Sequence, residues 1–175
     1  MANLLNQQPD YVFSQSRWGV TRKYLYDSGM LFREFKSHLK IGILPLVHAT
    51  SGINPETGKR LWAKGVVAIG RKAVGIIAIG QLAIGVISIG QLSISLLVAL
   101  GQLSIAGLFA AGQAGIGVVA IGQAAVGFVA IGQFAAGYYA LGQAGIGKFV
   151  LSVHTRNQQA VSFFKSLLEG LKKLI

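Results

Sequence analysis

The sequence contains no cysteine and very few acidic residues. Of its 175 residues, only five are Asp or Glu, against sixteen Lys or Arg. Without cysteine the chain can form neither disulfides nor thiolate metal sites. The acids Asp10, Asp27, Glu34, Glu56 and Glu169 lie far apart, and none is paired at a spacing useful for general acid–base catalysis or metal-assisted hydrolysis. We therefore expect no enzyme, no catalytic or metal-binding residues and no cofactor.

Two features that resemble catalytic signals are interpreted as structural. The three histidines, His38, His48 and His154, are scattered, and a lone histidine is more often structural than catalytic. Glycine-rich strings occur throughout the middle of the chain, but none is followed by Lys-Ser or Lys-Thr or lies in a βαβ unit. A phosphate-binding loop is therefore rejected, and no small-molecule substrate is evident.

The net charge of +11 is distributed unevenly, since residues 61–156 carry five bases and no acid. A positive and apolar chain indicates an anionic partner, which we expect to be membrane lipid rather than nucleic acid. The alternative is that the charge only keeps an apolar protein in solution. The start, MANLLNQQPDYVF, lacks the basic and apolar regions of a secretory signal. We therefore expect a membrane-associated protein on the cytoplasmic side.

A five-residue repeat of the form small–aliphatic–Gly–x–x fills the middle of the chain. The first of seventeen units begins at Ala63, and a typical unit is Ala78-Ile79-Gly80-Gln81-Leu82. Two units carry one extra residue each, near Val98 and Ala106. Alternate units differ in the residue that follows glycine, so the full period is ten residues. One set carries Arg71 and then Gln81, Gln91, Gln102, Gln113, Gln123, Gln133 and Gln143; the other carries Val66, Ile76, Val86, Leu96, Leu108, Val118, Phe128, Tyr138 and finally Lys148.

The serious competitor is a multi-span helical membrane protein, because the repeat is strongly apolar. Periodicity argues against it. Five residues advance a helix by about 500°, so that no apolar stripe persists from unit to unit. Glycine at every fifth position would also cost about 1 kcal/mol per site relative to alanine.

We predict instead an all-β fold, a parallel β-solenoid over residues 63–150. Aliphatic side chains are expected to fill the core, glycine to permit tight corners, and identical positions to stack at ~4.8 Å. A four-sided coil of about 20 residues would give two structural glutamine ladders, Gln81–Gln102–Gln123–Gln143 and, with Arg71, Gln91–Gln113–Gln133. It would also give two apolar ladders, Val66–Val86–Leu108–Phe128 and Ile76–Leu96–Val118–Tyr138. A flattened two-sided coil of ten residues is the alternative.

The period with its small and aliphatic positions resembles the pentapeptide-repeat proteins, although the Asn or Asp that usually precedes their central Leu is absent. That resemblance implies a right-handed quadrilateral β-helix. Residues 41–170 are more similar to uncharacterised bacterial proteins with long AIG-x-x arrays, which often carry segments like Pro45-Leu46-Val47-His48 and Asn54-Pro55-Glu56-Thr57-Gly58 before the array. This second resemblance implies a β-solenoid and no established activity.

The flanks are expected to close the ends of the solenoid. Residues 1–40 mix aromatic and basic side chains, with an amphipathic helix predicted from Met30 to Leu39 after the signal Asp27-Ser28-Gly29. They would pack over the first coil, or else bind a membrane or nucleic acid. Residues 41–62 read as a strand and a turn that form a hairpin leading into the repeat.

Residues 157–175 form a second predicted amphipathic helix, capped by Asn157. Its apolar face would cap the solenoid or lie on a membrane. The residues that would make this contact are Phe163, Phe164, Leu167, Leu168 and Leu171.

The function expected from these features is structural. Apolar ladders on the outside of a solenoid need a partner, since a large exposed apolar patch is unfavourable in water. We expect self-association into a homo-oligomer and membrane association through these faces; a soluble scaffold or filament module is the alternative. The interface candidates are Ile76, Val86, Leu96, Leu108, Val118, Phe128 and Tyr138.

Overall fold

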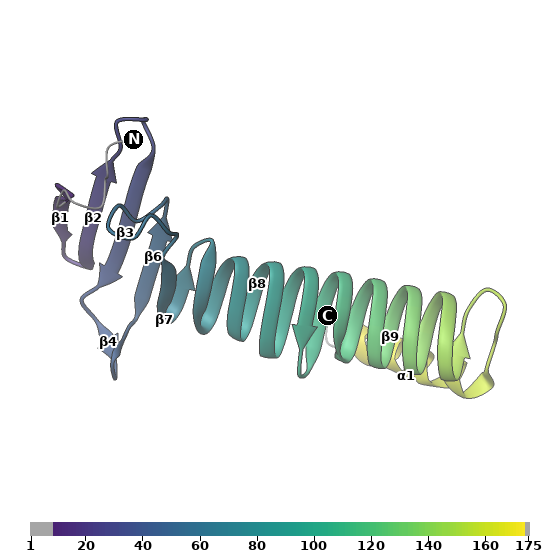
Figure 1. Cartoon of the computed structure of the whole chain (residues 1–175). Coiled ribbons are helices and arrows are strands. Elements are labelled where there is room, and N and C mark those ends of the chain that lie inside the picture. The colour runs from purple at the N-terminus through teal and green to yellow at the C-terminus, as the bar shows by residue number, and fades with distance from the viewer. Residues whose placement is uncertain (1–8, 174–175) are drawn as a thin grey trace. The chain divides into compact units, whose positions relative to one another are not determined.

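The computed structural model describes residues 9–173 in two compact units, Met1–Ile94 and Ser95–Ile175, which are treated separately (Figure 1). The first unit holds an N-terminal sheet and the first coils of a parallel β-solenoid. The second holds further coils and one helix. Residues 1–8 and 174–175 lie outside the described part, and with them the last two residues of the predicted C-terminal helix.

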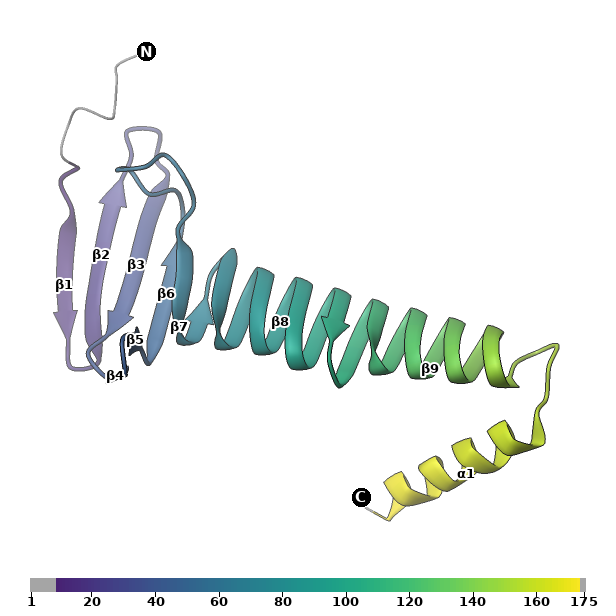
Figure 2. The same cartoon turned by 60° about the horizontal axis from the view of Figure 1, so that its bottom comes forward.

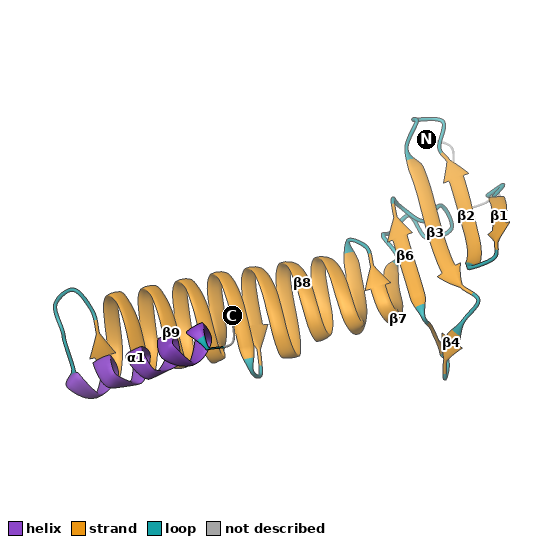
Figure 3. Cartoon of the chain, turned by 180° about the vertical axis from the view of Figure 1, so that it is seen from behind, coloured by secondary structure: helices purple, strands orange, loops and turns teal. Residues whose placement is uncertain are grey.

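The sheet of the first unit is antiparallel at its start and becomes parallel where the solenoid begins (Figure 3). Strands β1, β2, β3 and β6 pair antiparallel, and β6 then pairs in parallel with β7. A small separate sheet, β4 with β5, lies between β3 and β6 in the chain. The strands are β1 Val12–Ser16, β2 Gly19–Leu25, β3 Leu31–Ser37, β4 Lys40–Ile41, β5 Leu44–Pro45, β6 Val47–Ser51 and β7 Trp62–Ile69.

Two predictions for this region are wrong. The segment predicted as a helix from Met30 to Leu39 contains strand β3, in which Phe32 and Glu34 are buried, Leu31 and Arg33 are exposed, and Phe35 is half-buried. That alternation is the period of a strand, and Gly29 forms the preceding turn with φ +80°. The predicted hairpin into the repeat is absent, because β6 and β7 run parallel as successive coils; the hairpin is β4 with β5.

The repeat forms β8 (Lys72–Ala106) and β9 (Phe109–Leu151), and the predicted parallel β-solenoid is confirmed. The four-sided coil of about 20 residues is wrong. Ala63 pairs with Ala73 and Ala68 with Ala78, so one coil contains ten residues and two halves. The helical alternative is overturned, because the repeat forms strands β7, β8 and β9 with only short bends between them. No helix within residues 9–173 is long and apolar enough to cross a membrane.

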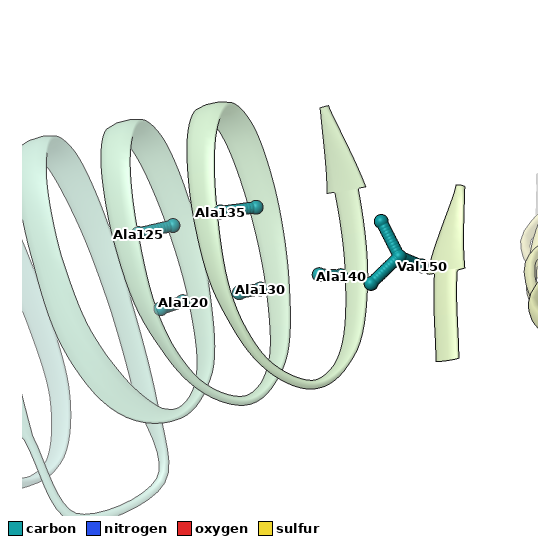
Figure 4. Packing of buried hydrophobic residues seen from close by; sticks show 6 residues of the cluster. All are labelled: Ala120, Ala125, Ala130, Ala135, Ala140 and Val150. Atoms are coloured by element: carbon teal, nitrogen blue, oxygen red, sulfur yellow. The ribbon is translucent and has the colours of Figure 1, made fainter. Parts of the chain in front are cut away.

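Alanine, not the aliphatic residue, fills the core of the coils. Alanines at the small position of each unit, such as Ala78 and Ala130, are fully buried (Figure 4), whereas the isoleucine that follows, as at Ile79, is exposed. The prediction of an aliphatic core is therefore wrong. A flattened coil brings its two sides so close that only a methyl group fits between them. Where serine replaces alanine, as at Ser104, its hydroxyl donates to backbone carbonyls.

The repeated glycines are required by close packing between coils rather than by tight corners. A Cβ at Gly132 would overlap the carbonyl oxygen of Gly122 one coil earlier, and Gly142 meets Gly132 in the same way. No described glycine of the repeat has a positive φ, so the predicted corner role is wrong. The glycine columns let successive backbones approach without a side chain between them.

The extra residue near Ala106 is absorbed as predicted, by a longer coil. Ala99 pairs with Ala110 and Val98 with Phe109, a shift of eleven residues instead of ten. The inward positions on either side of the insertion stay in register, because Ala99 and Ala110 are both fully buried. The insertion therefore protrudes at the bend and leaves the core unchanged.

Larger side chains close the core where the coils begin and end. In the first unit His48 pairs with Ala68, so its imidazole occupies an inward alanine position and is buried. In the second unit Val150 takes the inward position after Ala140 (Figure 4). Gly145 leaves room for it, since a Cβ there would lie 2.7 Å from Cγ1 of Val150. Asn157 then donates its backbone N–H to the Val150 carbonyl across the last edge.

Helix α1, Gln158–Lys172, lies along a side of the last coils in the second unit (Figure 2). The predicted N-cap of this helix is confirmed, because Oδ1 of Asn157 accepts hydrogen bonds from the backbone N–H groups of Gln159 and Ala160. Phe164 is buried against Val129. The helix therefore covers a side face, whereas Val150 and the turn after it close the end.

We expect Gly132→Ala to lower the free energy of unfolding by roughly 3 kcal/mol, the upper part of the overpacking range, since the added methyl overlaps backbone. Gly170→Ala is the matched control. Nothing lies within 4 Å of a Cβ at that helical position. There the change should stabilise by about 0.5–1 kcal/mol. Urea unfolding followed by circular dichroism measures both, and equal effects would contradict the close-packing role of glycine.

We expect Phe164→Ala to cost roughly 3 kcal/mol and to release α1 from the coils, because the ring is buried. Leu168 on the same helix is 57% exposed. Leu168→Ala should therefore change stability by no more than about 0.5 kcal/mol. Chemical denaturation monitored by the helical dichroism signal separates the two. A similar loss in both variants would show that α1 does not pack as described.

Candidate functional site

A buried carboxylate lies at the start of the solenoid in the first unit. Glu34 on β3 has a side chain only 2% exposed, surrounded by three basic partners. Nε of Arg22 donates to its Oε2, while Nζ of Lys36 lies 3.0 Å and Nε2 of His48 lies 2.9 Å from its Oε1. The strands fix this arrangement, because β2 and β6 flank β3 and bring Arg22 and His48 to the same carboxylate.

Both ring nitrogens of His48 are engaged. The backbone N–H of Lys64 donates to Nδ1 at 2.8 Å. Nδ1 must then be the unprotonated nitrogen, and Nε2–H donates to Glu34. The Lys64 carbonyl oxygen also lies 3.1 Å from Nδ1, but the shorter contact is with the N–H group, which requires an acceptor. The imidazole therefore links the first coil to the sheet and offers no free nitrogen as a general base.

The pKa of Glu34 also argues against a role in proton transfer. Burial alone would raise its pKa, but hydrogen bonds from His48, Lys36 and Arg22 outweigh burial and lower the pKa to about 2. The carboxylate is thus ionised at any physiological pH and cannot act as a proton donor. This cluster holds the start of the solenoid together.

A hollow of about 630 Å³ opens beside this cluster. Its floor includes Glu34 and His48, and its apolar wall includes Leu44, Leu61 and Trp62. The remaining charges around it are all positive. They are Lys36, Lys40, Lys59, Arg60 and Lys64.

The hollow is therefore electropositive. Within residues 9–173, only Lys36 of these five bases forms an ion pair with an acid. An apolar wall combined with uncompensated cations fits an anion that carries an apolar part. The described residues hold no group of three or more metal-ligating side chains, and His38 and His154 are exposed.

Within each unit, the ten-residue coil places the predicted glutamines of both ladders on one edge. A four-sided coil would place alternate glutamines on opposite sides. In the ten-residue coil each glutamine instead lies one coil after the previous one, so the prediction of two ladders is wrong. Nε of Arg71 donates to Oε1 of Gln81 one coil later at 2.7 Å, as expected for neighbours on one edge. In the second unit, Gln123, Gln133 and Gln143 border a shallow hollow with the glycines beside them.

In each unit, the predicted interface residues lie at the bends opposite the glutamines. In the first unit Ile76 is exposed and Val86 partly so. In the second unit Leu96 is 67% and Phe128 is 52% exposed, and the Phe128 ring stacks on Tyr138 at 4.9 Å with an interplanar angle of 6°. The row there consists of Leu96, Leu108, Val118, Phe128 and Tyr138, and is called the apolar edge from here on.

The predicted contact residues of α1 divide into two groups. Phe163 stacks on Tyr139 with ring centroids 4.0 Å apart, and Phe164 is buried. Leu167, Leu168 and Leu171 remain exposed. The helix thus uses its aromatic pair to hold the coils and presents leucines outward.

Comparison of the chain with protein-family models, with curated proteins and with solved structures finds no match. The resemblance to pentapeptide-repeat and AIG-x-x proteins therefore stays a prediction, and the functional argument rests on the chain's own geometry. Neither the cluster nor the hollow is predicted by the sequence patterns described above. One available signal was the spacing of His48, whose distance from Ala68 in sequence is a multiple of the ten-residue period that separates the inward alanines.

We expect Glu34→Gln to lower the free energy of unfolding of the first unit by roughly 3 kcal/mol, because the buried side chain loses the negative charge that contacts Arg22, Lys36 and His48. Both tryptophans, Trp18 and Trp62, lie in this unit, so tryptophan fluorescence during urea unfolding reports on it. Glu56→Gln is the control, since Glu56 is 46% exposed. It should change stability by less than about 1 kcal/mol.

The pH dependence follows from the direction of the pKa shift. The folded-state pKa is below the ordinary value of 4.5, so the contribution of Glu34 is complete above that pH and is lost as pH falls toward about 2. The difference in stability between wild type and Glu34→Gln should therefore shrink across this acidic window. A difference that stayed constant down to pH 2 would contradict the assignment.

Proposed function

We propose that this protein is a non-catalytic structural scaffold whose solenoid associates with a second copy of the chain along the apolar edge. The observation that carries the proposal is the exposed row from Leu96 to Tyr138. At a strand spacing of ~4.8 Å, its five side chains extend over about 20 Å. A contiguous exposed apolar surface is unfavourable in water, and large surfaces of this kind mark sites of interaction with another protein or a membrane.

Neighbouring side chains widen this surface. Val126 is separated from Phe128 by one glycine, and Ile116 is separated from Val118 in the same way; both are exposed. No acidic residue interrupts the coils. The paired rings of Phe128 and Tyr138 are large and rigid, the kind of side chain that contributes most to protein interfaces.

The charge at one end of the row favours an antiparallel pair. Lys148 follows Tyr138 in the column, with its Nζ 5.2 Å from the Tyr138 ring centroid. A parallel pair would place two Lys148 ammonium groups together, whereas an antiparallel pair separates them and gives an isologous interface. We therefore propose a twofold dimer with antiparallel edges.

The absence of catalysis is part of this proposal and is supported by the engaged state of the best candidate groups, Glu34 and His48. Membrane association and a cytoplasmic location stay predictions. The soluble scaffold, which was the alternative in the sequence analysis, agrees best with a solenoid whose side is covered by its own helix.

Phe128→Lys should abolish self-association, because it places a cation in the middle of the apolar edge. Gln123→Lys is the matched control: it adds the same charge to the opposite edge, at the next earlier bend of the repeat. Sedimentation velocity over a range of concentrations measures both, with circular dichroism to verify folding. We expect the wild type and Gln123→Lys to dimerise and Phe128→Lys to be monomeric. A wild-type protein that is monomeric at every concentration would refute the proposal.

A further inference from the structure

A short apolar hairpin projects beside the electropositive hollow of the first unit. Strands β4 and β5 pair Lys40 with Pro45 and Ile41 with Leu44, and Gly42 makes the turn with φ +61°. Ile43 at the tip is 94% exposed. Leu39 and Ile41 are also largely exposed. The hairpin therefore presents three large aliphatic side chains to the surroundings.

The stem of this hairpin is fixed to the sheet. The backbone N–H of Leu46 donates to the Leu39 carbonyl at 2.8 Å. The buried hydroxyl of Ser37 donates to the same carbonyl and accepts from the backbone N–H of Val47. The exposed tip is thus held by hydrogen bonds at its base rather than left as a loose loop.

The hairpin and the hollow share residues. Ile43, Leu44 and Pro45 line the hollow, opposite Lys59 and Arg60 from the loop after β6. Lys40 lies on the hairpin itself and also lines the hollow. The apolar tip of the hairpin and the positively charged hollow therefore form one continuous surface, which is apolar at the tip and cationic in the hollow.

We propose that this surface binds anionic phospholipid at a membrane. The tip residues Ile41 and Ile43 enter the acyl boundary, and a headgroup phosphate lies in the hollow between Lys59, Arg60 and Lys64. The two chemistries match the two parts of such a lipid, because basic groups are attracted to the anionic surface and aliphatic groups to the boundary beneath it.

Other anions fit this surface less well. A soluble phosphate would be satisfied by the cations alone and would leave the tip of Ile43 in water. A nucleic acid would be bound by phosphate contacts and by bases stacked on aromatic rings. Among the residues that line the hollow, the aromatic rings are those of Trp62 and His48, and the His48 ring is buried.

The full-length chain tests the proposal by flotation with vesicles. Vesicles of phosphatidylcholine alone are compared with vesicles of equal parts phosphatidylcholine and phosphatidylglycerol. The wild type should float only with the anionic vesicles. Arg60→Glu should weaken binding about tenfold or more, since the charge is reversed inside the hollow. Ile43→Ser should also weaken it about tenfold, because the tip loses its apolar contact.

Arg33→Glu is the matched control. Arg33 lies on β3 next to Glu34 in sequence, but it lines a separate hollow with Phe35 and Ile69. Adjacent strand residues point to opposite faces, so this variant changes the net charge equally without entering the site. It should retain vesicle binding within about twofold of wild type. Equal losses in Arg60→Glu and Arg33→Glu would overturn the site and leave only non-specific attraction.

Trp62 provides a direct reading of the hollow. With Trp18→Phe as background, Trp62 is the sole tryptophan. Its fluorescence should shift to the blue with anionic vesicles. The same fluorescence measurement is made with inorganic phosphate and with glycerol phosphate in place of vesicles. If they shift Trp62 equally and Ile43→Ser has no effect on vesicle flotation, the ligand is a soluble anion and the lipid proposal is overturned.

This inference is independent of the proposed dimer. The Phe128→Lys variant should bind anionic vesicles through the unchanged hairpin and hollow. Vesicle binding by that monomeric variant supports the lipid site even where the apolar edge has lost its partner. Loss of binding in Phe128→Lys, with its folding intact, would contradict a site confined to the first unit.

Discussion

The interior of each coil has room for little more than one methyl group per half-turn, and most other features follow from this limit. Ala63, Ala68, Ala73 and the inward alanines of later coils are buried, and the glycine columns meet backbone to backbone. A ten-residue coil has two opposed walls only a side chain apart. Larger residues inside would force the walls apart and break the parallel hydrogen bonds between coils.

The same limit directs the aliphatic residues outward and so creates the surfaces with functional potential. Residues such as Ile79 and Ile121 cannot enter the core and remain exposed on the sides. In the second unit α1 covers one such side with Phe163 and Phe164. The apolar edge has no such cover among the described residues, which is why a second copy of the chain is the partner proposed for it.

The narrow core also needs closing, and the two units do this with different chemistry. In the second unit Val150 fills the last inward position with an aliphatic side chain. In the first unit an imidazole fills the equivalent position, and its buried polarity is satisfied by Glu34 and the Lys64 backbone. Bases beyond those that Glu34 neutralises then surround the adjacent hollow. The Glu34–His48 cluster that closes the core therefore lies beside a positively charged hollow and an apolar hairpin.

Sequence periodicity by itself determined that the repeat is a parallel solenoid, that Gln81 and its equivalents alternate with apolar residues, and that Asn157 caps a helix. Those conclusions need only local patterns. Coil length did not follow, because ten and twenty residues are both multiples of the same five-residue unit. Only the register of Ala63 with Ala73 settled it, and with it which residues are inside. The Glu34–His48 cluster and the hollow depend on strands distant in sequence meeting in space, which no local pattern in the chain encodes.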